Sequence, residues 1–472
     1  MSATTRSPLV LHHTLESDAC PVAVYEALYD RAPETFLYES LQTDGERGRY
    51  SFLGGAPRAI ALLANGVTTI TRDGDKRTSE LSFADACRAL LGELPALPEI
   101  APFAGGLVGF LSFDYARQIE RLPDANPDTL HLPDALMMAP GELVIIDHIE
   151  RRTDILLSGA SATQDRIDHI AALIRASADQ PITPEAATPT GELDPARIRA
   201  SMTREDYEAA VVTAKAHIVA GDIFQVVPSQ RFSVDLPCDA LTLYKALRIT
   251  NPSPYMYFLN FDGFQIVGSS PEMVVQCADR RARIRPLAGT RKRGQTPEED
   301  AQLEADLRGD AKECAEHVML VDLARNDLGK VCEFGGVTTS ELLDVERYAR
   351  VMHIVSNVDG KLRPDCDAFD LIHAVFPAGT VSGAPKIRAM EIIDALENTR
   401  RGLYGGAIGY VGTNGHVDLC LAIRTFVVKD GVAHAQAGAG VVADSDPARE
   451  YEETLNKAAG LFRALKTLES DQ

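Results

Sequence analysis

The chain has 472 residues, and its 47 Lys plus Arg against 68 Asp plus Glu give a formal net charge of −21 at pH 7. A composition of 45% hydrophobic and 24% charged residues excludes a disordered chain, a fibrous repeat and a disulfide-rich miniprotein. The acidic excess repels phosphate backbones and anionic lipid, and Trp is absent, so we expect neither a nucleic-acid nor a membrane partner.

Eight cysteines are scattered along the chain without a C-x-x-C pair, a pattern typical of a reduced cytosol. We interpret them as core residues rather than zinc ligands. The sequence contains neither a signal-peptide pattern nor a window of ~18 apolar residues that could cross a membrane. The expected location is therefore cytoplasmic.

Residues 1–175 alternate strand-like and helical patterns. Apolar alternation predicts strands over 67–71 and 143–146, and helical spacing predicts helices over 83–94 and 165–176. These patterns favour an α+β domain.

A stretch rich in proline and small polar residues, ASADQPITPEAATPTGELDP, begins at Ala176. Such a composition indicates a linker. We therefore divide the chain into an N-terminal α+β domain over 1–175, a linker over 176–199 and a second domain over 200–472.

The second domain opens with a clear helix signal. Thr203 followed by Asp206 resembles a capping box, and the apolar spacing continues until Gly221. A strand is predicted to follow over 223–228.

Two further predicted helices each carry a pair of glutamates three residues apart. Asp310 caps one helix, which continues through Leu328, and the other begins after Asp446 with Pro447 in its first turn. The pairs are Glu313 with Glu316, and Glu450 with Glu453. If the two faces meet, the carboxylates raise one another's pKa until a cation neutralises them, and oxygen-only ligands favour Mg²⁺. Alternatively, these side chains face water and complement the helix dipoles.

A glycine-containing turn and a lone arginine are candidates for binding an anion. Gly438 and Gly440 lie in QAGAG after a strand-like run, where backbone N–H groups can approach a carboxylate, although a bulge or tight turn is the alternative. Arg424 is a charged residue within the apolar run 421–425, which we expect to be a strand. Because burying its charge is costly, we predict that Arg424 binds a carboxylate.

The segment 377–386 contains two glycines and Lys386 but lacks the spacing of a phosphate-binding P-loop. Pro385 can instead open a helix over Lys386–Leu396, which places Thr380 beside a possible ligand. His353 alternates with apolar neighbours and is either a satisfied structural histidine or a base near neutral pH.

Taken in order, these segments resemble the chorismate-binding enzymes, and among them the anthranilate synthase component I group. The resemblance is strong from about Thr203 to Gly460 and looser around Tyr38. The segments that carry it are 268–272, 285–291, 316–327, 352–356, 376–386, 403–406 and 436–453.

The resemblance implies an α+β chorismate-utilising fold in which a regulatory domain precedes the catalytic domain. It implies that Glu316 and Glu453 contact Mg²⁺, with Glu313 and Glu450 in support. The positions that it implies for substrate binding are Gly289, Thr290, Tyr404, Arg424, Gly438, Ala439 and Gly440.

The chemistry implied is the addition of ammonia at C2 of chorismate with loss of the C4 hydroxyl, followed by release of pyruvate and anthranilate. Glu272 is the expected acid, with a pKa raised by burial and by nearby carboxylates. His353, with Thr380 close by, is the candidate for removing the C2 proton in the second step.

Two positions argue against sibling reactions. Isochorismate and salicylate synthases carry a water-activating lysine where this chain has Gln225, and aminodeoxychorismate synthases usually carry a lysine where it has Ala288. The alternatives that stay open are a sibling chorismate enzyme and a catalytically silent sensor.

The family's tryptophan site is also implied. Glu39 and Ser40 match its first motif, in which Tyr38 replaces a leucine, and the second motif is intact through Pro254, Tyr255 and Met256. No glutaminase nucleophile motif is present, so the resemblance implies a separate glutamine amidotransferase subunit, in an assembly of two of each chain.

Overall fold

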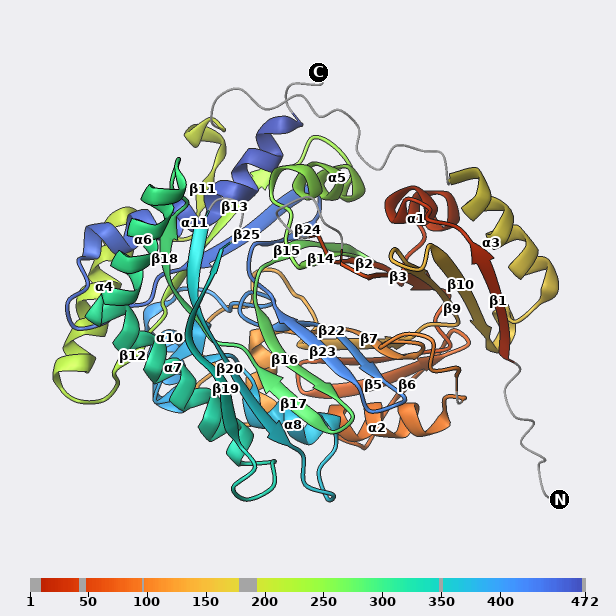
Figure 1. Ribbon diagram of the computed structural model, residues 1–472, viewed down its shortest axis with the longest axis horizontal. Helices are drawn as coiled ribbons and strands as arrows, with labels where there is room; N and C mark the ends of the chain where they lie inside the picture. Colours follow the sequence, from red (N-terminus) through yellow and green to blue (C-terminus); the bar gives the residue numbers. More distant parts are fainter. Residues whose placement is uncertain (1–9, 42–47, 96, 178–192, 348–350, 469–472) are drawn as a thin grey trace.

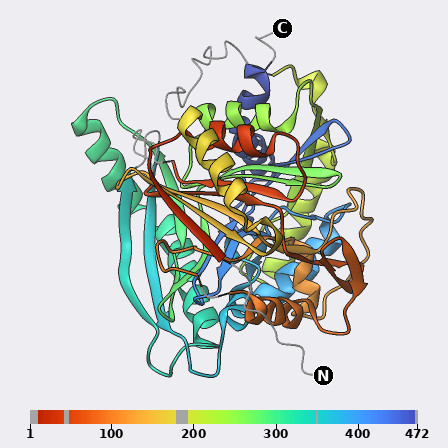
Figure 2. The same ribbon diagram turned by 90° about the vertical axis from the view of Figure 1, so that its right-hand side faces the viewer.

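The computed structural model describes residues 10–41, 48–95, 97–177, 193–347 and 351–468. Two large antiparallel sheets are stacked on each other, and helices cover their outer faces (Figures 1 and 2). This arrangement of sheets and surrounding helices confirms the predicted α+β class.

The first sheet has 11 strands, and its centre joins strands from both ends of the chain. β2 pairs with β14, so that Glu39 lies opposite Met256. Its order is β1 (Val10–Glu16), β10 (Arg152–Ser158), β9 (Glu142–Asp147), β3 (Tyr50–Gly55), β2 (Thr35–Glu39), β14 (Tyr255–Phe261), β15 (Phe264–Ser270), β24 (Thr425–Lys429), β25 (Val432–Gly438), β13 (Ser229–Asp235) and β11 (Arg199–Ala200).

The second sheet has 12 strands and mixes the two halves of the chain in the same way, because β7 pairs with β22. Its order is β18 (Leu287–Lys292), β20 (Val351–Lys361), β17 (Arg281–Ile284), β16 (Met273–Ala278), β23 (Val417–Leu421), β22 (Ala407–Gly412), β7 (Gly106–Leu111), β8 (Ala135–Ala139), β4 (Ala59–Ala64), β5 (Val67–Arg72) and β6 (Asp75–Thr78), with β19 (Thr338–Arg347) on β20. A separate short pair joins β12 (Gln225–Val226) to β21 (Gly383–Ala384).

Three hydrophobic clusters hold these layers together. One lies between the sheets and includes Phe36, Phe110 and Tyr257, and the others lie beneath the helices on each outer face. On the first sheet pack α1 (Pro21–Tyr29), α3 (Gln164–Ser177), α5 (Ala240–Thr250) and α11 (Pro447–Thr467). The other main helices are α2 (Phe83–Glu93), α4 (Arg204–Val219), α6 (Pro297–Gly309), α7 (Ala311–Gly329), α8 (Ala368–Val375), α9 (Gly379–Ser382) and α10 (Lys386–Leu396).

The predicted helix starts are confirmed by their caps. The side chain of Thr203 accepts a hydrogen bond from the backbone N–H of Asp206, and Asp446 accepts one from that of Arg449. Asp310 accepts from two backbone N–H groups at the start of α7. The strands predicted over 67–71 and 143–146 are confirmed as β5 and β9, and the helices over 83–94 and 165–176 as α2 and α3.

Two strand predictions are wrong in extent. The segment 223–228 forms only the two-residue strand β12, because its partner β21 is equally short and the chain enters β13 at Ser229. Arg424 does not lie within a strand: it has φ +52 and connects β23 of the second sheet to β24 of the first. The apolar run 421–425 is continuous because both strands are buried on either side of this crossing.

The predicted division at 176–199 stays a prediction. Residues 178–192 lie outside the described residues, and inside the predicted linker the structure has a short helical turn over Pro195–Arg197 and the strand β11. Both sheets contain strands from before and after the division. The two predicted domains therefore share one hydrogen-bonded framework.

The cysteines are free thiols, and burial confirms the core interpretation for Cys20, Cys87, Cys277, Cys332, Cys366 and Cys420, while Cys238 and Cys314 are partly exposed. Within the described ranges, every helix is too short or too polar to span a bilayer.

Candidate active site

Glu272 lies in the two-residue connection between β15 and β16, where it faces α9. Its Oε1 accepts a 2.6 Å hydrogen bond from the Thr380 hydroxyl. Desolvation raises the pKa of Glu272 to about 7, whereas the Thr380 hydrogen bond, Lys457 and Arg424 lower it. The raised pKa is confirmed, but the predicted contribution from nearby carboxylates is wrong, because cations surround this group. A carboxyl group with this pKa can be a proton donor at neutral pH.

Arg424 lies beside this acid, at the crossing between the sheets. Desolvation and the neighbouring Arg463 lower its pKa, while Tyr404 and Glu272 raise it. A half-buried guanidinium without an anion destabilises the fold, and the left-handed backbone of Arg424 adds to that cost. A bound anion would offset the cost of burying the charge. Arg424 therefore remains the strongest candidate for binding a substrate carboxylate.

Tyr404 lies close to Gly438, and it raises the pKa of Arg424. Burial raises the pKa of Tyr404 to about 12, so its hydroxyl remains a donor. A Cβ on Gly438 would lie 2.9 Å from that hydroxyl and 2.6 Å from the Pro228 carbonyl oxygen, which explains the glycine. The N–H of Ala439 already donates to the Pro228 carbonyl, so this N–H is not open to an anion in this arrangement.

Lys457 on α11 joins these groups and was missed by the sequence analysis. Its ammonium donates to the Gly438 carbonyl at 3.0 Å and lies 2.7 Å from Glu453. It also lowers the pKa of Glu272. The signal that could have found it is its position four residues after Glu453, which places both side chains on one face of the helix.

Gln225 is buried on β12, with its Nε2 2.8 Å from the position that a Cβ on Gly440 would occupy. Its Oε1 has no hydrogen-bond partner within the described part of the chain. A buried acceptor without a donor is destabilising, and a ligand N–H would satisfy it.

His353 on β20 contacts the irregular part of the neighbouring strand β18 that contains the predicted substrate contacts Gly289 and Thr290. Its Nδ1 lies 2.9 Å from the Gly289 carbonyl, which can only accept, and 3.1 Å from the Thr290 hydroxyl. The Nδ1–H tautomer follows, with the basic lone pair on Nε2. Desolvation lowers the pKa of His353, with a smaller contribution from Arg424, so the ring is neutral at pH 7 and can act as a base.

The two glutamate pairs influence each other across α7 and α11. Desolvation raises the pKa of Glu316, and the charges of Glu313, Glu450 and Glu453 raise it further while Lys312 lowers it. The pKa of Glu450 is raised by desolvation and by Glu453. The two helix faces therefore lie close enough for their charges to interact, which the sequence analysis gave only as a condition.

The four glutamate carboxylates of these two helix faces are not arranged as a metal coordination sphere. In the residues that the structure describes, no group of three or more His, Cys, Asp or Glu is arranged to hold a metal ion. Lysine and arginine side chains stand near the carboxylates instead: Lys312 is 3.8 Å from Glu316, and Arg291 is 3.5 Å from Glu313. The donors fit a hard divalent cation in chemistry, since all are carboxylate oxygens whose repulsion is incompletely compensated.

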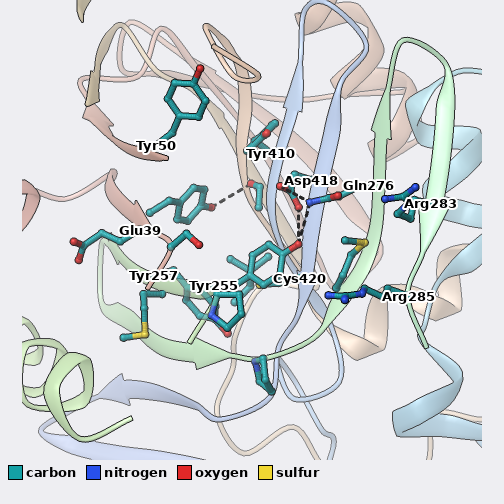
Figure 3. A pocket seen from close by; sticks show the side chains of 18 of the residues that line it. Glu39, Tyr50, Tyr255, Tyr257, Gln276, Arg283, Arg285, Tyr410, Asp418 and Cys420 are labelled. Atoms are coloured by element: carbon teal, nitrogen blue, oxygen red, sulfur yellow. Dashed lines mark hydrogen bonds between the residues drawn. The ribbon is translucent and has the colours of Figure 1, made fainter. Parts of the chain in front are cut away.

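A separate cavity of about 510 Å³ lies between the sheets (Figure 3). The predicted tryptophan residues Glu39, Ser40, Pro254, Tyr255 and Met256 all line it. The two motifs meet because β2 and β14 are neighbouring strands. The cavity wall also contains residues 271 and 273, which flank Glu272 in the chain.

The carboxylate of Glu39 is committed to the protein itself. It accepts from Arg248 Nε and Nη2 at 2.9 Å and from the Tyr244 hydroxyl at 2.6 Å, and Figure 3 shows it pointing away from the other labelled side chains. Tyr38, the departure from the family motif, donates to the Gly409 carbonyl of the opposite sheet at 3.1 Å.

We expect Arg248→Met to lower the free energy of unfolding by about 3–5 kcal/mol, because it leaves the buried Glu39 carboxylate without its cation. Urea denaturation measures the change. Lys245→Met on the same helix is the matched control: it breaks the partly exposed pair with Glu26 at 2.8 Å and should cost at most about 1 kcal/mol. Equal losses in the two variants would contradict this account of the Glu39 pair.

The comparisons with known proteins show which family the chain belongs to. The sequence profile of the chorismate binding enzymes matches residues 34–463. Anthranilate synthase component 1 from Cereibacter sphaeroides is 46% identical, covering 94% of this chain and 91% of the relative. The protein of that name from Pseudomonas aeruginosa is 45% identical, covering 98% and 96%.

Solved structures give the same result. Anthranilate synthase component I from Streptococcus pneumoniae TIGR4 superposes with a TM-score of 0.77 at 36% identity, covering 88% of this chain and 92% of that one. The menaquinone-specific isochorismate synthase from Escherichia coli has a TM-score of 0.71 at 20% identity, covering 97% and 95%, a likeness of fold alone. The chain belongs to the chorismate-binding enzyme family.

Proposed function

We propose that this protein converts chorismate and ammonia to anthranilate and pyruvate, the first committed step of tryptophan biosynthesis. The observation that carries the proposal is Glu272: its pKa is raised to about 7, Thr380 holds it, and it lies beside Arg424. The names of the relatives that match nearly the whole chain support the same activity.

The substrate's two carboxylates need two binding groups. Arg424, with the hydroxyl of Tyr404, would bind one carboxylate, and Gly289 and Thr290 of β18 would lie on the other side of the substrate. Glu316 and Glu453 would hold Mg²⁺, with Glu313 and Glu450 supporting. The bound ion would withdraw electron density from the ring through its carboxylate.

In the first step ammonia adds at C2 of the ring while the C4–O bond breaks. Glu272 gives its proton to the departing oxygen, so that water leaves, and the Thr380 hydroxyl holds Oε1 in place. The adding ammonia must lose one proton, which returns the carboxyl group to its acid form. The sum is chorismate plus ammonia giving an aminated diene plus water.

In the second step the C2 proton and the enolpyruvyl group leave together. His353, as the neutral Nδ1–H tautomer, takes the proton at Nε2, and the enolpyruvyl oxygen–ring bond breaks. Protonation of the released enol gives pyruvate, and the ring becomes aromatic as anthranilate.

Gln225 favours ammonia over water as the nucleophile. Its neutral Oε1, without a partner in the described residues, can accept a hydrogen bond from ammonia but cannot deprotonate water. Ala288 offers no amine to attack C2 or C4.

We also propose a glutamine amidotransferase subunit as the ammonia source, in an assembly of two of each chain, and feedback inhibition by tryptophan. The "component 1" in the relatives' names supports a partner. Support for inhibition comes from the cavity that both tryptophan motifs line, whose wall flanks Glu272.

Fluorescence of anthranilate tests the proposal. Chorismate, Mg²⁺ and ammonium should give anthranilate, removal of ammonium should stop it, and added tryptophan should reduce it. Isochorismate or 4-amino-4-deoxychorismate as product would favour a sibling enzyme. Binding of chorismate without any turnover would favour a silent sensor.

We expect His353→Met to accumulate the aminated intermediate, because addition is intact while the base for the second step is gone. Chromatography of the reaction mixture should show the intermediate growing as anthranilate formation falls by about 10²- to 10⁴-fold. His317→Met is a matched control on the neighbouring α7, since His317 is buried and hydrogen-bonded to Ser356. An unchanged yield of anthranilate from His353→Met would remove the assigned role.

A further inference from the structure

A carboxylate stands in the wall of the cavity between the sheets. Asp418 on β23 accepts from the Tyr255 hydroxyl at 3.0 Å and from the amide of Gln276 at 3.1 Å, as Figure 3 shows. Desolvation raises the pKa of Asp418 to about 6. At pH 8 the group is therefore ionised, although both of its hydrogen-bond partners are neutral.

Four other charged residues of this wall are paired with an opposite charge, and the carboxylate of Glu341 accepts a hydrogen bond from the Asn357 amide. Glu39 pairs with Arg248, Arg283 with Asp359, and Arg285 with Glu346. An ionised carboxylate has about four acceptor sites, and the two donors occupy two of them. Asp418 thus retains capacity for a donor from a molecule in the cavity.

The surroundings of Asp418 are suited to an aromatic ring. Tyr410 lies directly opposite it in the register of β22 and β23, and Tyr255, Met273 and Cys420 also line the cavity. An α-ammonium group would lose its water against such a surface, whereas a flat ring with one N–H packs on it and uses the carboxylate.

We infer that Asp418 is a specificity-determining residue of this cavity, accepting a hydrogen bond from the ring N–H of an indole. The inference rests on the proposed inhibition by tryptophan and extends it. It explains how the cavity can separate tryptophan from an amino acid whose aromatic ring has no donor, such as phenylalanine.

The sharpest test changes one atom of the ligand. In 3-benzothienylalanine a sulfur replaces the ring N–H of tryptophan with nearly the same shape. Calorimetry at pH 8 should give the unmodified protein a Kd for tryptophan about 10- to 100-fold lower than for the analogue, the range for a hydrogen bond to a charged group. The protein contains no Trp of its own, so ligand fluorescence checks tryptophan binding independently.

Variants assign the effect to the residue. Asp418→Ala should bring the ratio of the two Kd values to about 1, and Asp418→Asn should leave an intermediate ratio, since a neutral acceptor remains. Glu341→Gln is the matched control, because it removes another carboxylate of the same wall; its ratio should stay that of the unmodified protein.

The outcomes separate the two claims. Equal affinities of the unmodified protein for both ligands would overturn the role of Asp418 and leave the tryptophan site standing. No binding of either ligand would overturn both. If Asp418→Ala lacks a cooperative melting transition, the unmodified protein and Asp418→Asn still decide.

Discussion

Glu272→Gln is expected to lower kcat for anthranilate formation by about 10²- to 10⁴-fold, because it removes the proton donor for the departing oxygen while keeping the side chain's size. A continuous fluorescence assay with saturating chorismate, Mg²⁺ and ammonium measures it. Glu341→Gln, an acid-to-amide change in the neighbouring cavity, is the control and should retain activity. A kcat within a few-fold of the unmodified protein would contradict the assignment of Glu272.

The dependence of kcat on pH should also show that Glu272 acts as the acid. The acid form of Glu272 is lost as pH rises through its pKa of about 7, so kcat should fall on the alkaline side when free ammonia is held constant. The Thr380 hydrogen bond lowers that pKa. Thr380→Val should therefore move the alkaline limb to higher pH, and a limb that stays in place or moves down would speak against the coupling.

Glu316→Gln and Glu453→Gln are each expected to lower Mg²⁺-dependent turnover by about 10³-fold or more, because the polarisation supplied by a bound cation is worth several kcal/mol. The measurement is the rate as a function of Mg²⁺ concentration. Loss of the metal response, rather than a uniform fall at every concentration, is the expected result.

The control for these two variants lies on α11, next to Glu453. Glu452 is exposed and pairs with Arg204 on α4 at 2.8 Å, so Glu452→Gln should keep the Mg²⁺ response of the unmodified protein. Full activity of Glu316→Gln or Glu453→Gln would remove that residue from the metal site. An equal loss of turnover in all three variants would mean that the net charge of α7 and α11 matters, and that neither Glu316 nor Glu453 is a metal ligand.

The helices could be predicted well from the sequence, because the interactions that start them lie between residues close together in the chain. Asp310, Thr203 and Asp446 cap α7, α4 and α11 through side-chain bonds within three residues. The glutamate pairs could be predicted for the same reason, since their spacing on each helix is set by the helix itself. That the two faces share one region was a hypothesis, and the raised pKa of Glu316 supports it.

The failures come from contacts between distant segments. Arg424 lies in an apolar run that resembles one strand, but the chain leaves one sheet and enters the other there. Periodicity does not distinguish one buried strand from two joined by a crossing. The cationic surroundings of Glu272 likewise depend on Lys457 from α11, almost two hundred residues away, and only the fold brings them together.

The tryptophan motifs predicted some of the residues that line the cavity, but not the contacts that those residues make. The residues Glu39 and Tyr255 were predicted to belong to one site, and both line one cavity. The sequence did not indicate that the Glu39 carboxylate is held by Arg248, or that Asp418 lies in the same wall. Those facts depend on the packing of α5 and the stacking of the two sheets.

The proposed activity requires that nitrogen from ammonia enters the chorismate ring in this site. The most direct measurement supplies the protein with chorismate, Mg²⁺ and ¹⁵N-ammonium and identifies the products by mass spectrometry. We expect ¹⁵N-labelled anthranilate together with an equal amount of pyruvate. Isochorismate, labelled 4-amino-4-deoxychorismate, or chorismate left unchanged would contradict it.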